Sequence, residues 1–144
     1  MEADVARARI VVADDNKEIR DKAVRLLEPE FEVVALVDDG EALMQVVPQM
    51  RPDVCITDIS MPKINGIEAA ARLKQNGFES KILFLTVHED RDSIRAALEV
   101  GAAGYVLKSR MATDLCMAVN GVISGEVFVS PTSIFPHRPQ PARD

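Results

Sequence analysis

The chain has 144 residues, of which 47% are apolar, and it carries a formal net charge of −6. Its length and apolar content suit one domain with an ordinary buried core, while the acidic balance disfavours a protein that binds DNA or RNA through a dense cationic surface. The sequence has neither an apolar signal-peptide core nor an apolar stretch approaching the roughly 18 residues of a membrane span, so we expect a soluble, cytoplasmic protein without a membrane or direct nucleic-acid partner.

Five apolar runs rich in Val, Ile, Leu and Phe divide the chain, at residues 9–13, 31–37, 53–57, 81–86 and 104–108. Several of them lack the polar alternation of a half-exposed strand, which predicts buried parallel strands. Cys55 lies inside one run and is expected to be a buried thiol rather than half of a disulfide.

Between and after these runs, apolar residues recur at helical spacing, so a helix is predicted after each strand. The last helix is expected to stop near Gly121 to Gly125. Five such units demand right-handed crossovers and a parallel sheet covered on both faces. The prediction is a doubly wound α/β fold with five strands in the order 2-1-3-4-5 and five helices. It occupies residues 1–130, followed by a proline-rich tail or linker at 131–144.

Polar side chains follow or close four of the predicted strands: Asp14 and Asp15 after the first, Asp58 after the third, Thr86 on the fourth and Lys108 on the fifth. Because strands one and three are neighbours in this order, the three acids should converge on one crevice. Any one of these residues alone has an ordinary explanation, since Asp often caps a helix and Lys often faces solvent. Five at one edge of a sheet favour a functional site.

Three adjacent carboxylates repel one another unless some are protonated or a cation lies among them. An all-oxygen ligand set that leaves room for water favours Mg²⁺. A carboxylate can also attack phosphorus, which makes Asp58 a candidate nucleophile. Lys108 could then bind the phosphoryl oxygens as a charge and Thr86 as a hydrogen-bond donor. The residues therefore predict a site that handles phosphoryl groups.

Four sequence segments, VADD, TDISMPKINGIEAA, LT and GAAGYVLK, together resemble a bacterial two-component response-regulator receiver domain, over about residues 8–129. The segments GAAGYVLKS, DL, AV and GEVFVSP are similar to those of the NarL/FixJ (LuxR-type) subgroup, which usually carries a helix-turn-helix domain after a linker. The resemblance implies the flavodoxin- or CheY-like version of the fold predicted above.

The resemblance also implies roles for single residues. Asp58 would be the phosphoacceptor and Asp15 a direct Mg²⁺ ligand. Asp14 would bind the ion through a water molecule or lie just behind its direct ligands. The backbone carbonyl of Ser60 would complete the metal site. The resemblance further implies that Met61 and Pro62 shape the loop after Asp58, and that Gly66 makes the turn into the next helix.

Other implied roles concern the switch. Thr86 and Lys108 would bind the phosphoryl group, and the rotamer of Tyr105 would follow Thr86. Ser60 and His88 would flank the path of the attacking water and tune the phosphate lifetime, although an exposed His88 at a helix start is an equally ordinary interpretation. Many receivers have proline after the lysine, whereas this chain has Ser109. A trans peptide bond is therefore expected there.

The favoured hypothesis is a switch that is not an enzyme. It receives its phosphoryl group from a sensor histidine kinase, forms a homodimer on phosphorylation, and controls a DNA-binding domain that this chain lacks. The dimer would use the first and fifth helices, or the fourth helix and fifth strand. Alternatives are a stand-alone receiver, an interaction module that is never phosphorylated, and an aspartyl-phosphate hydrolase. The last needs a general acid two residues after Asp58, where Ser60 stands.

Overall fold

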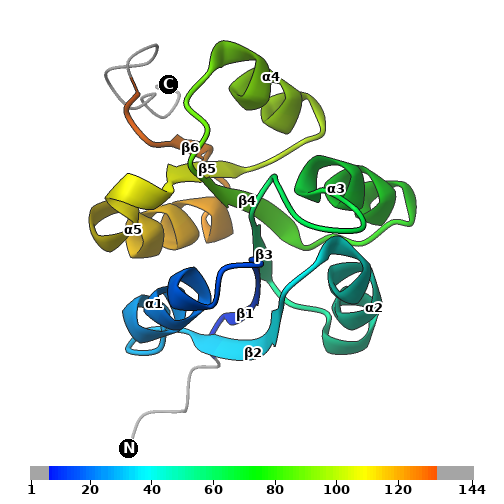
Figure 1. The fold of residues 1–144 in the computed structure, drawn as a ribbon. Coiled ribbons are helices and arrows are strands. Elements are labelled where there is room, and N and C mark those ends of the chain that lie inside the picture. The colour runs from blue at the N-terminus through cyan, green and yellow to red at the C-terminus, as the bar shows by residue number, and fades with distance from the viewer. Residues whose placement is uncertain (1–6, 133–144) are drawn as a thin grey trace, which may run out of the picture.

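A parallel sheet forms the centre of the computed structural model, which describes residues 7–132 (Figure 1). Its strand order is β2-β1-β3-β4-β5-β6. The predicted order 2-1-3-4-5 is confirmed, and a short sixth strand extends the sheet beyond β5. The strands are β1 (Arg9–Ala13), β2 (Glu32–Val37), β3 (Val54–Thr57), β4 (Lys81–Thr86), β5 (Gly104–Leu107) and β6 (Phe128–Val129).

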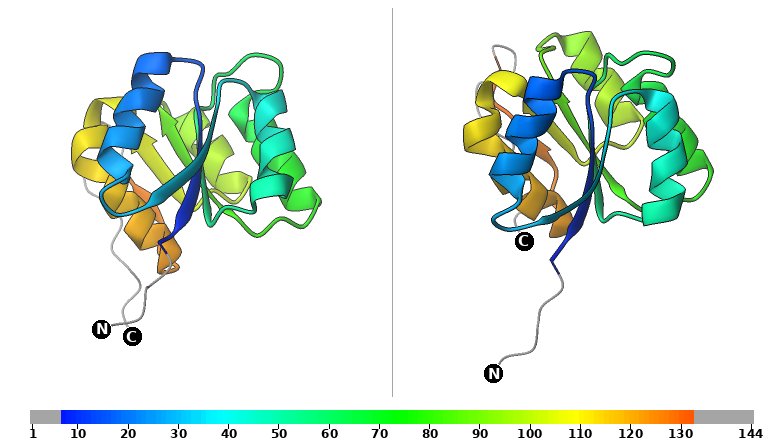
Figure 2. Two further views of the ribbon diagram at one scale, coloured as in Figure 1. Left: turned by 90° about the horizontal axis from the view of Figure 1, so that it is seen from below. Right: turned by 60° about the horizontal axis from the view of Figure 1, so that its bottom comes forward.

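Within residues 7–132, five α-helices cover the sheet on both faces (Figure 2). They are α1 (Lys17–Leu27), α2 (Gly40–Met50), α3 (Gly66–Gln75), α4 (Arg91–Glu99) and α5 (Met111–Ile123). Helices α1 and α5 pack on one face, and α2, α3 and α4 pack on the other. Each face therefore has its own apolar core.

The central strands are apolar at every position because both of their faces are covered. In β1, Ile10 and Val12 belong to the core under α1 and α5, while Val11 and Ala13 belong to the opposite core. All four are at most 1% exposed. This is why the predicted strands lacked polar alternation.

Four of the helices begin with a side-chain cap. The carboxylate or amide oxygen of the capping residue accepts a hydrogen bond from a backbone amide of the first turn. The caps are Asn16, Asp39, Asn65 and Asp90. The acids at the strand ends are therefore not needed as helix caps, which removes the ordinary explanation for them.

The element boundaries agree with the sequence analysis except near the C-terminus. β5 ends at Leu107, and Lys108 begins a single 3₁₀ turn, η1 (Lys108–Arg110), rather than closing the strand. Helix α5 ends at Ile123, inside the predicted stretch. Ser130 is fully buried, and residues 133–144 of the predicted tail lie outside the described residues.

Within residues 7–132, no helix is both long and apolar enough to cross a membrane. Cys55 and Cys116 are free thiols, as expected, and Cys55 is buried. Burial raises the pKa of the Cys55 thiol to about 12.

Candidate functional site

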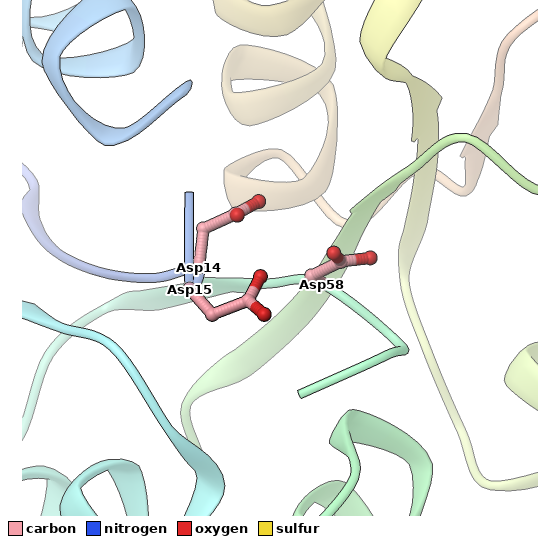
Figure 3. A group of neighbouring side chains, drawn as sticks. All are labelled: Asp14, Asp15 and Asp58. Carbon is pink, nitrogen blue, oxygen red and sulfur yellow. The ribbon is translucent and has the colours of Figure 1, made fainter. Parts of the chain in front are cut away.

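The three acids at the strand ends form one cluster, with ligand oxygens all within 4.8 Å of one another (Figure 3). The pairing of β1 with β3 explains this, because Ala13 stands beside Thr57 in the register and the next residues are Asp14 and Asp58. The Asp58 amide also donates to the Ala13 carbonyl at 3.0 Å. Asp14 and Asp58 are buried, whereas Asp15 is exposed. The convergence predicted from the sequence is therefore present.

Lys108, the residue after β5, joins the cluster from a strand end that lies two strands away from β3. Its ammonium nitrogen lies 2.8 Å from Asp14 Oδ2 and 2.9 Å from Asp58 Oδ2, and the side chain is only 12% exposed. Burial lowers the pKa of Lys108, but the close contacts with Asp14 and Asp58 together outweigh it, so the pKa lies above its usual value. The lysine is thus a charged bridge between two buried carboxylates.

The environment of Asp14 shows whether the cluster suits a metal ion. Its Oδ1 accepts a hydrogen bond from the Asn16 amide at 2.8 Å. Its Oδ2 is buried without a hydrogen-bond partner among residues 7–132; the 2.8 Å contact with Lys108 is an ion pair outside hydrogen-bond geometry. Burial, which is the largest influence, raises the pKa of Asp14. Three carboxylates beside the Lys108 ammonium leave excess negative charge, and an all-oxygen set of this kind suits Mg²⁺.

A cleft of about 430 Å³ is lined by Asp15, the exposed member of the cluster. It places Asp15 and the loop after Asp58, including Ser60, Met61 and Pro62, around one space. Ser60, whose carbonyl is assigned to the metal by resemblance, therefore lines the same cleft as Asp15. Room for water or phosphate oxygens next to a carboxylate such as Asp15 is what a Mg²⁺ site requires.

Both carboxylate oxygens of Asp58 are held. Oδ1 accepts from the Ile59 amide at 2.7 Å and Oδ2 accepts from Lys108 at 2.9 Å. The backbone around it is tightly packed, because a Cβ on Gly66 would lie 2.0 Å from the Asp58 carbonyl oxygen. Gly66 also donates its amide to the Ile59 carbonyl at 2.8 Å. The glycine expected at this turn is therefore needed for close approach of two backbone segments.

Thr86 and Tyr105 meet at His88. The Thr86 hydroxyl oxygen accepts a hydrogen bond from the His88 amide at 3.2 Å, and the Tyr105 hydroxyl donates to the His88 carbonyl at 2.8 Å. Thr86 and Tyr105 are both fully buried, and burial raises the pKa of Tyr105. Tyr105 therefore points inward and is tied to the segment that follows Thr86.

His88 also reaches the loop after Asp58, since its Nε2 lies 3.0 Å from Ser60 Oγ. The two residues expected to tune the phosphate lifetime are thus in direct contact. Sequence reasoning singled out the His88 side chain and missed its backbone, which links Thr86 to Tyr105. No signal in the residue types marks such a backbone contact. The Lys108–Ser109 peptide bond is trans, as expected, because residues 7–132 contain no cis peptide.

Comparison with known proteins gives consistent matches. The response regulator receiver domain family matches residues 10–120. The transcriptional regulatory protein DegU of Brevibacillus brevis is 41% identical over 127 residues, which is 87% of this chain and 54% of DegU. The oxygen regulatory protein NreC of Staphylococcus epidermidis is 38% identical over 84% of this chain and 57% of NreC. The chain thus spans little more than half the length of these relatives.

Among solved structures, the signal receiver domain of NarL from Mycobacterium tuberculosis superimposes with a TM-score of 0.82. It is 31% identical in sequence, and the match covers 85% of this chain and 100% of that domain. The fold and the sequence similarity therefore point to the same kind of protein.

Proposed function

The chain belongs to the response regulator receiver family, with relatives of the NarL and DegU type, and we propose that it accepts a phosphoryl group on Asp58 from the phosphohistidine of a sensor histidine kinase. The observation that carries this proposal is the environment of Asp58. Its carboxylate lies within 4.8 Å of two other acids and is bridged to one of them by Lys108. This set of groups can hold a carboxylate nucleophile, a divalent cation and a phosphoryl group together.

In the proposed transfer, a carboxylate oxygen of Asp58 attacks phosphorus and forms a new O–P bond. The N–P bond of the phosphohistidine breaks, its electron pair returns to the imidazole, and the imidazole takes up a proton from water. The Ile59 amide and Lys108 fix the orientation of the Asp58 carboxylate before the attack. Orientation of this kind lowers the barrier by reducing the entropy lost in reaching the reactive geometry.

The family normally binds Mg²⁺ at such an acidic cluster, and the residues here fit the ion. We assign Asp15, Asp58 and the Ser60 carbonyl as its ligands. Asp14 would bind the ion through a water molecule or lie just behind its direct ligands. When bound, Mg²⁺ would offset the negative charge that opposes approach of a phosphoryl group to three carboxylates.

Lys108 and Thr86 would hold the transferred group. Lys108 already lies 2.9 Å from Asp58, and the Thr86 hydroxyl, which now accepts from the His88 amide, would donate its proton to a phosphoryl oxygen. The added charge would draw the segment after Thr86 inward. Tyr105 would follow, because its hydroxyl is bound to the His88 carbonyl. The surface of α4, β5 and α5 would then change its partner.

Ser60 and His88 would tune how long the phosphoryl group persists. Their side chains are in contact at 3.0 Å, and Ser60 stands two residues after the proposed phosphoacceptor. The pair would lie beside the route that water takes to reach phosphorus. We assign both residues to control of hydrolysis rather than of phosphoryl transfer.

The output of the switch is also a proposal. DegU is a transcriptional regulatory protein of which this chain matches about half, so we propose that residues 1–130 act as the receiver and that residues 131–144 link it to a DNA-binding domain. The receiver itself would not touch nucleic acid, and would act in the cytoplasm. Homodimerisation on phosphorylation would use α1 and α5, or α4 and β5. A stand-alone receiver acting by protein contacts is the alternative.

Incubation with acetyl phosphate and Mg²⁺, followed by intact mass measurement, tests the proposal. Wild type should gain one labile phosphoryl group, and the gain should vanish in EDTA and in Asp58→Asn. Asp92→Asn is the matched control, because Asp92 is an exposed acid on α4 and its loss should leave the gain unchanged. A folded wild type without any gain, or an Asp58→Asn variant that keeps it, would contradict the assignment.

A further inference from the structure

Ser130 is the residue at which the chain leaves the sheet. It directly follows β6, which lies beside β5 at the edge of the sheet (Figure 1). Its amide donates to the Tyr105 carbonyl at 2.8 Å, its hydroxyl accepts from the Leu107 amide at 3.2 Å, and the same hydroxyl donates to Asp114 Oδ2 at 2.7 Å. The side chain is fully buried. Neither Ser130 nor Asp114 was predicted from the sequence to have a role.

The Ser130 hydroxyl takes the place of a strand carbonyl. In the parallel ladder, Phe128 donates to the Ala103 carbonyl and Ser130 donates to the Tyr105 carbonyl. The regular continuation would pair the Leu107 amide with a backbone carbonyl. Because the hydroxyl accepts this hydrogen bond instead, the backbone after Ser130 no longer has to follow β5. A side-chain hydrogen bond thus ends the ladder, while Ser130, the residue after β6, stays fixed.

Asp114 supplies the charge in this arrangement. It lies in the first turn of α5 and is 2% exposed. Its Oδ2 accepts from Ser130 and also from Arg110 Nε at 2.9 Å. A buried carboxylate requires such donors, and hydrogen bonds to a charged acceptor are about twice as strong as neutral ones. One carboxylate oxygen therefore joins the end of β6 to the end of η1.

These contacts involve residues on both sides of Lys108 in the chain. The Leu107 amide, which binds Ser130, precedes it in the chain, and Arg110, which shares Asp114 with Ser130, closes the η1 turn that Lys108 begins. Lys108 is itself held by Asp14 and Asp58. A displacement of the Lys108 backbone must therefore shift both the Leu107 amide and the Arg110 side chain.

We propose that the Leu107 amide, Asp114 and Ser130 form an exit latch that fixes the start of the C-terminal segment, and that phosphorylation of Asp58 opens it. This rests on the proposed function, because Lys108 moves only if it follows a phosphoryl oxygen on Asp58. This movement disturbs the hydrogen bonds of Ser130 with the Leu107 amide and with Asp114 together, and it releases the segment that begins at Ser130. The state of the site is thereby transmitted to the chain that leads toward the output.

Hydrogen exchange measured by mass spectrometry on the 144-residue chain tests the latch. Without phosphodonor, amides of residues 128–132 should exchange about tenfold faster in Ser130→Ala than in wild type, because a charge-assisted buried hydrogen bond is lost. Asp114→Asn should show the same direction of change. Ser124→Ala removes an exposed hydroxyl after α5 and should leave the exchange unchanged.

The coupling is tested by adding acetyl phosphate and Mg²⁺, with intact mass recorded on the same samples. In wild type, exchange of residues 128–132 should accelerate on phosphorylation, whereas Ser130→Ala should be phosphorylated equally and show no further change. Phosphorylation of wild type without faster exchange of this segment overturns the coupling. Absence of phosphorylation refutes the proposed function and the coupling with it, while the samples without donor still decide whether the latch exists. Equal exchange of Ser130→Ala and wild type in those samples overturns the latch.

Discussion

Replacing Lys108 with alanine would leave two buried carboxylates without their shared cation. The lysine side chain is 12% exposed, and the side chains of Asp14 and Asp58 are 1% and 7% exposed. Removing one partner of a buried ion pair costs about 3–5 kcal/mol. Asp14 and Asp58 each keep one backbone amide donor, and exposed Asp15 keeps the cluster open to counter-ions on one side. We therefore expect a loss of about 2–3 kcal/mol in the free energy of unfolding.

Urea unfolding with and without Mg²⁺ measures this loss. In EDTA, Lys108→Ala should be less stable than wild type by the amount above. Mg²⁺ should narrow the difference, because the ion no longer competes with an ammonium group 2.8 Å from Asp14 and 2.9 Å from Asp58. A ligand at one hundred times its dissociation constant stabilises the folded state by about 2.7 kcal/mol. Mg²⁺ should therefore restore most of the free energy of unfolding that Lys108→Ala loses.

The matched control is Lys81→Ala, an exposed lysine at the start of β4, which should change stability by no more than about 0.5 kcal/mol. Two results would refute the reasoning about Lys108. One is equal stability of wild type and Lys108→Ala in EDTA. The other is a difference between the two proteins that Mg²⁺ leaves unchanged or widens.

Two further predictions concern glycines and thiols. A Cβ on Gly66 would lie 2.0 Å from the Asp58 carbonyl oxygen, so Gly66→Ala should lower the free energy of unfolding by about 1–3 kcal/mol in urea. In α5, the nearest atom to a Cβ on Gly121 is a side-chain oxygen at 3.4 Å, so Gly121→Ala should raise it by about 0.5–1 kcal/mol. A Gly66→Ala variant more stable than Gly121→Ala would contradict this packing. Burial raises the pKa of Cys55 to about 12, which leaves about one thiolate in ten thousand at pH 8. Maleimide should therefore label half-buried Cys116 first and Cys55 only after unfolding, and early labelling of Cys55 in the native protein would show that the strand opens.

The features predicted from the sequence are those that depend on strand topology. Two acids after one strand and a third after its neighbour must meet in a parallel sheet of this order, whatever their rotamers. The sixth strand could not be found this way, because the two residues Phe128–Val129 carry no measurable period. The contact of Ser130 with Asp114, 16 residues earlier, was hidden because a serine before a proline-rich stretch has the composition of a linker.

The reach of long side chains was another feature that the sequence could not predict. The sequence placed Lys108 near a phosphoryl group, but its contact with Asp58 in the absence of phosphate depends on a side chain that crosses the width of β4. Neighbouring strands are about 4.8 Å apart, so this span is two strand spacings. The hydrogen bond from Tyr105 to the His88 carbonyl was beyond prediction for another reason, because any residue at position 88 supplies the same carbonyl.

The charges of the site explain why a divalent ion and a phosphoryl group would act together. Three carboxylates lie within 4.8 Å, and Lys108 bridges two of them, so these four side chains carry two negative charges in excess when all are ionised. One divalent cation restores neutrality, whereas a monovalent ion does not. Phosphorylation then turns the single charge of Asp58 into nearly two, and the new negative charge can be met only by groups that move toward it. Lys108 already contacts Asp58 and follows its phosphoryl oxygens, so the movement is shared by the Thr86 hydroxyl and by the backbone that joins Lys108 to Arg110, where the exit latch begins.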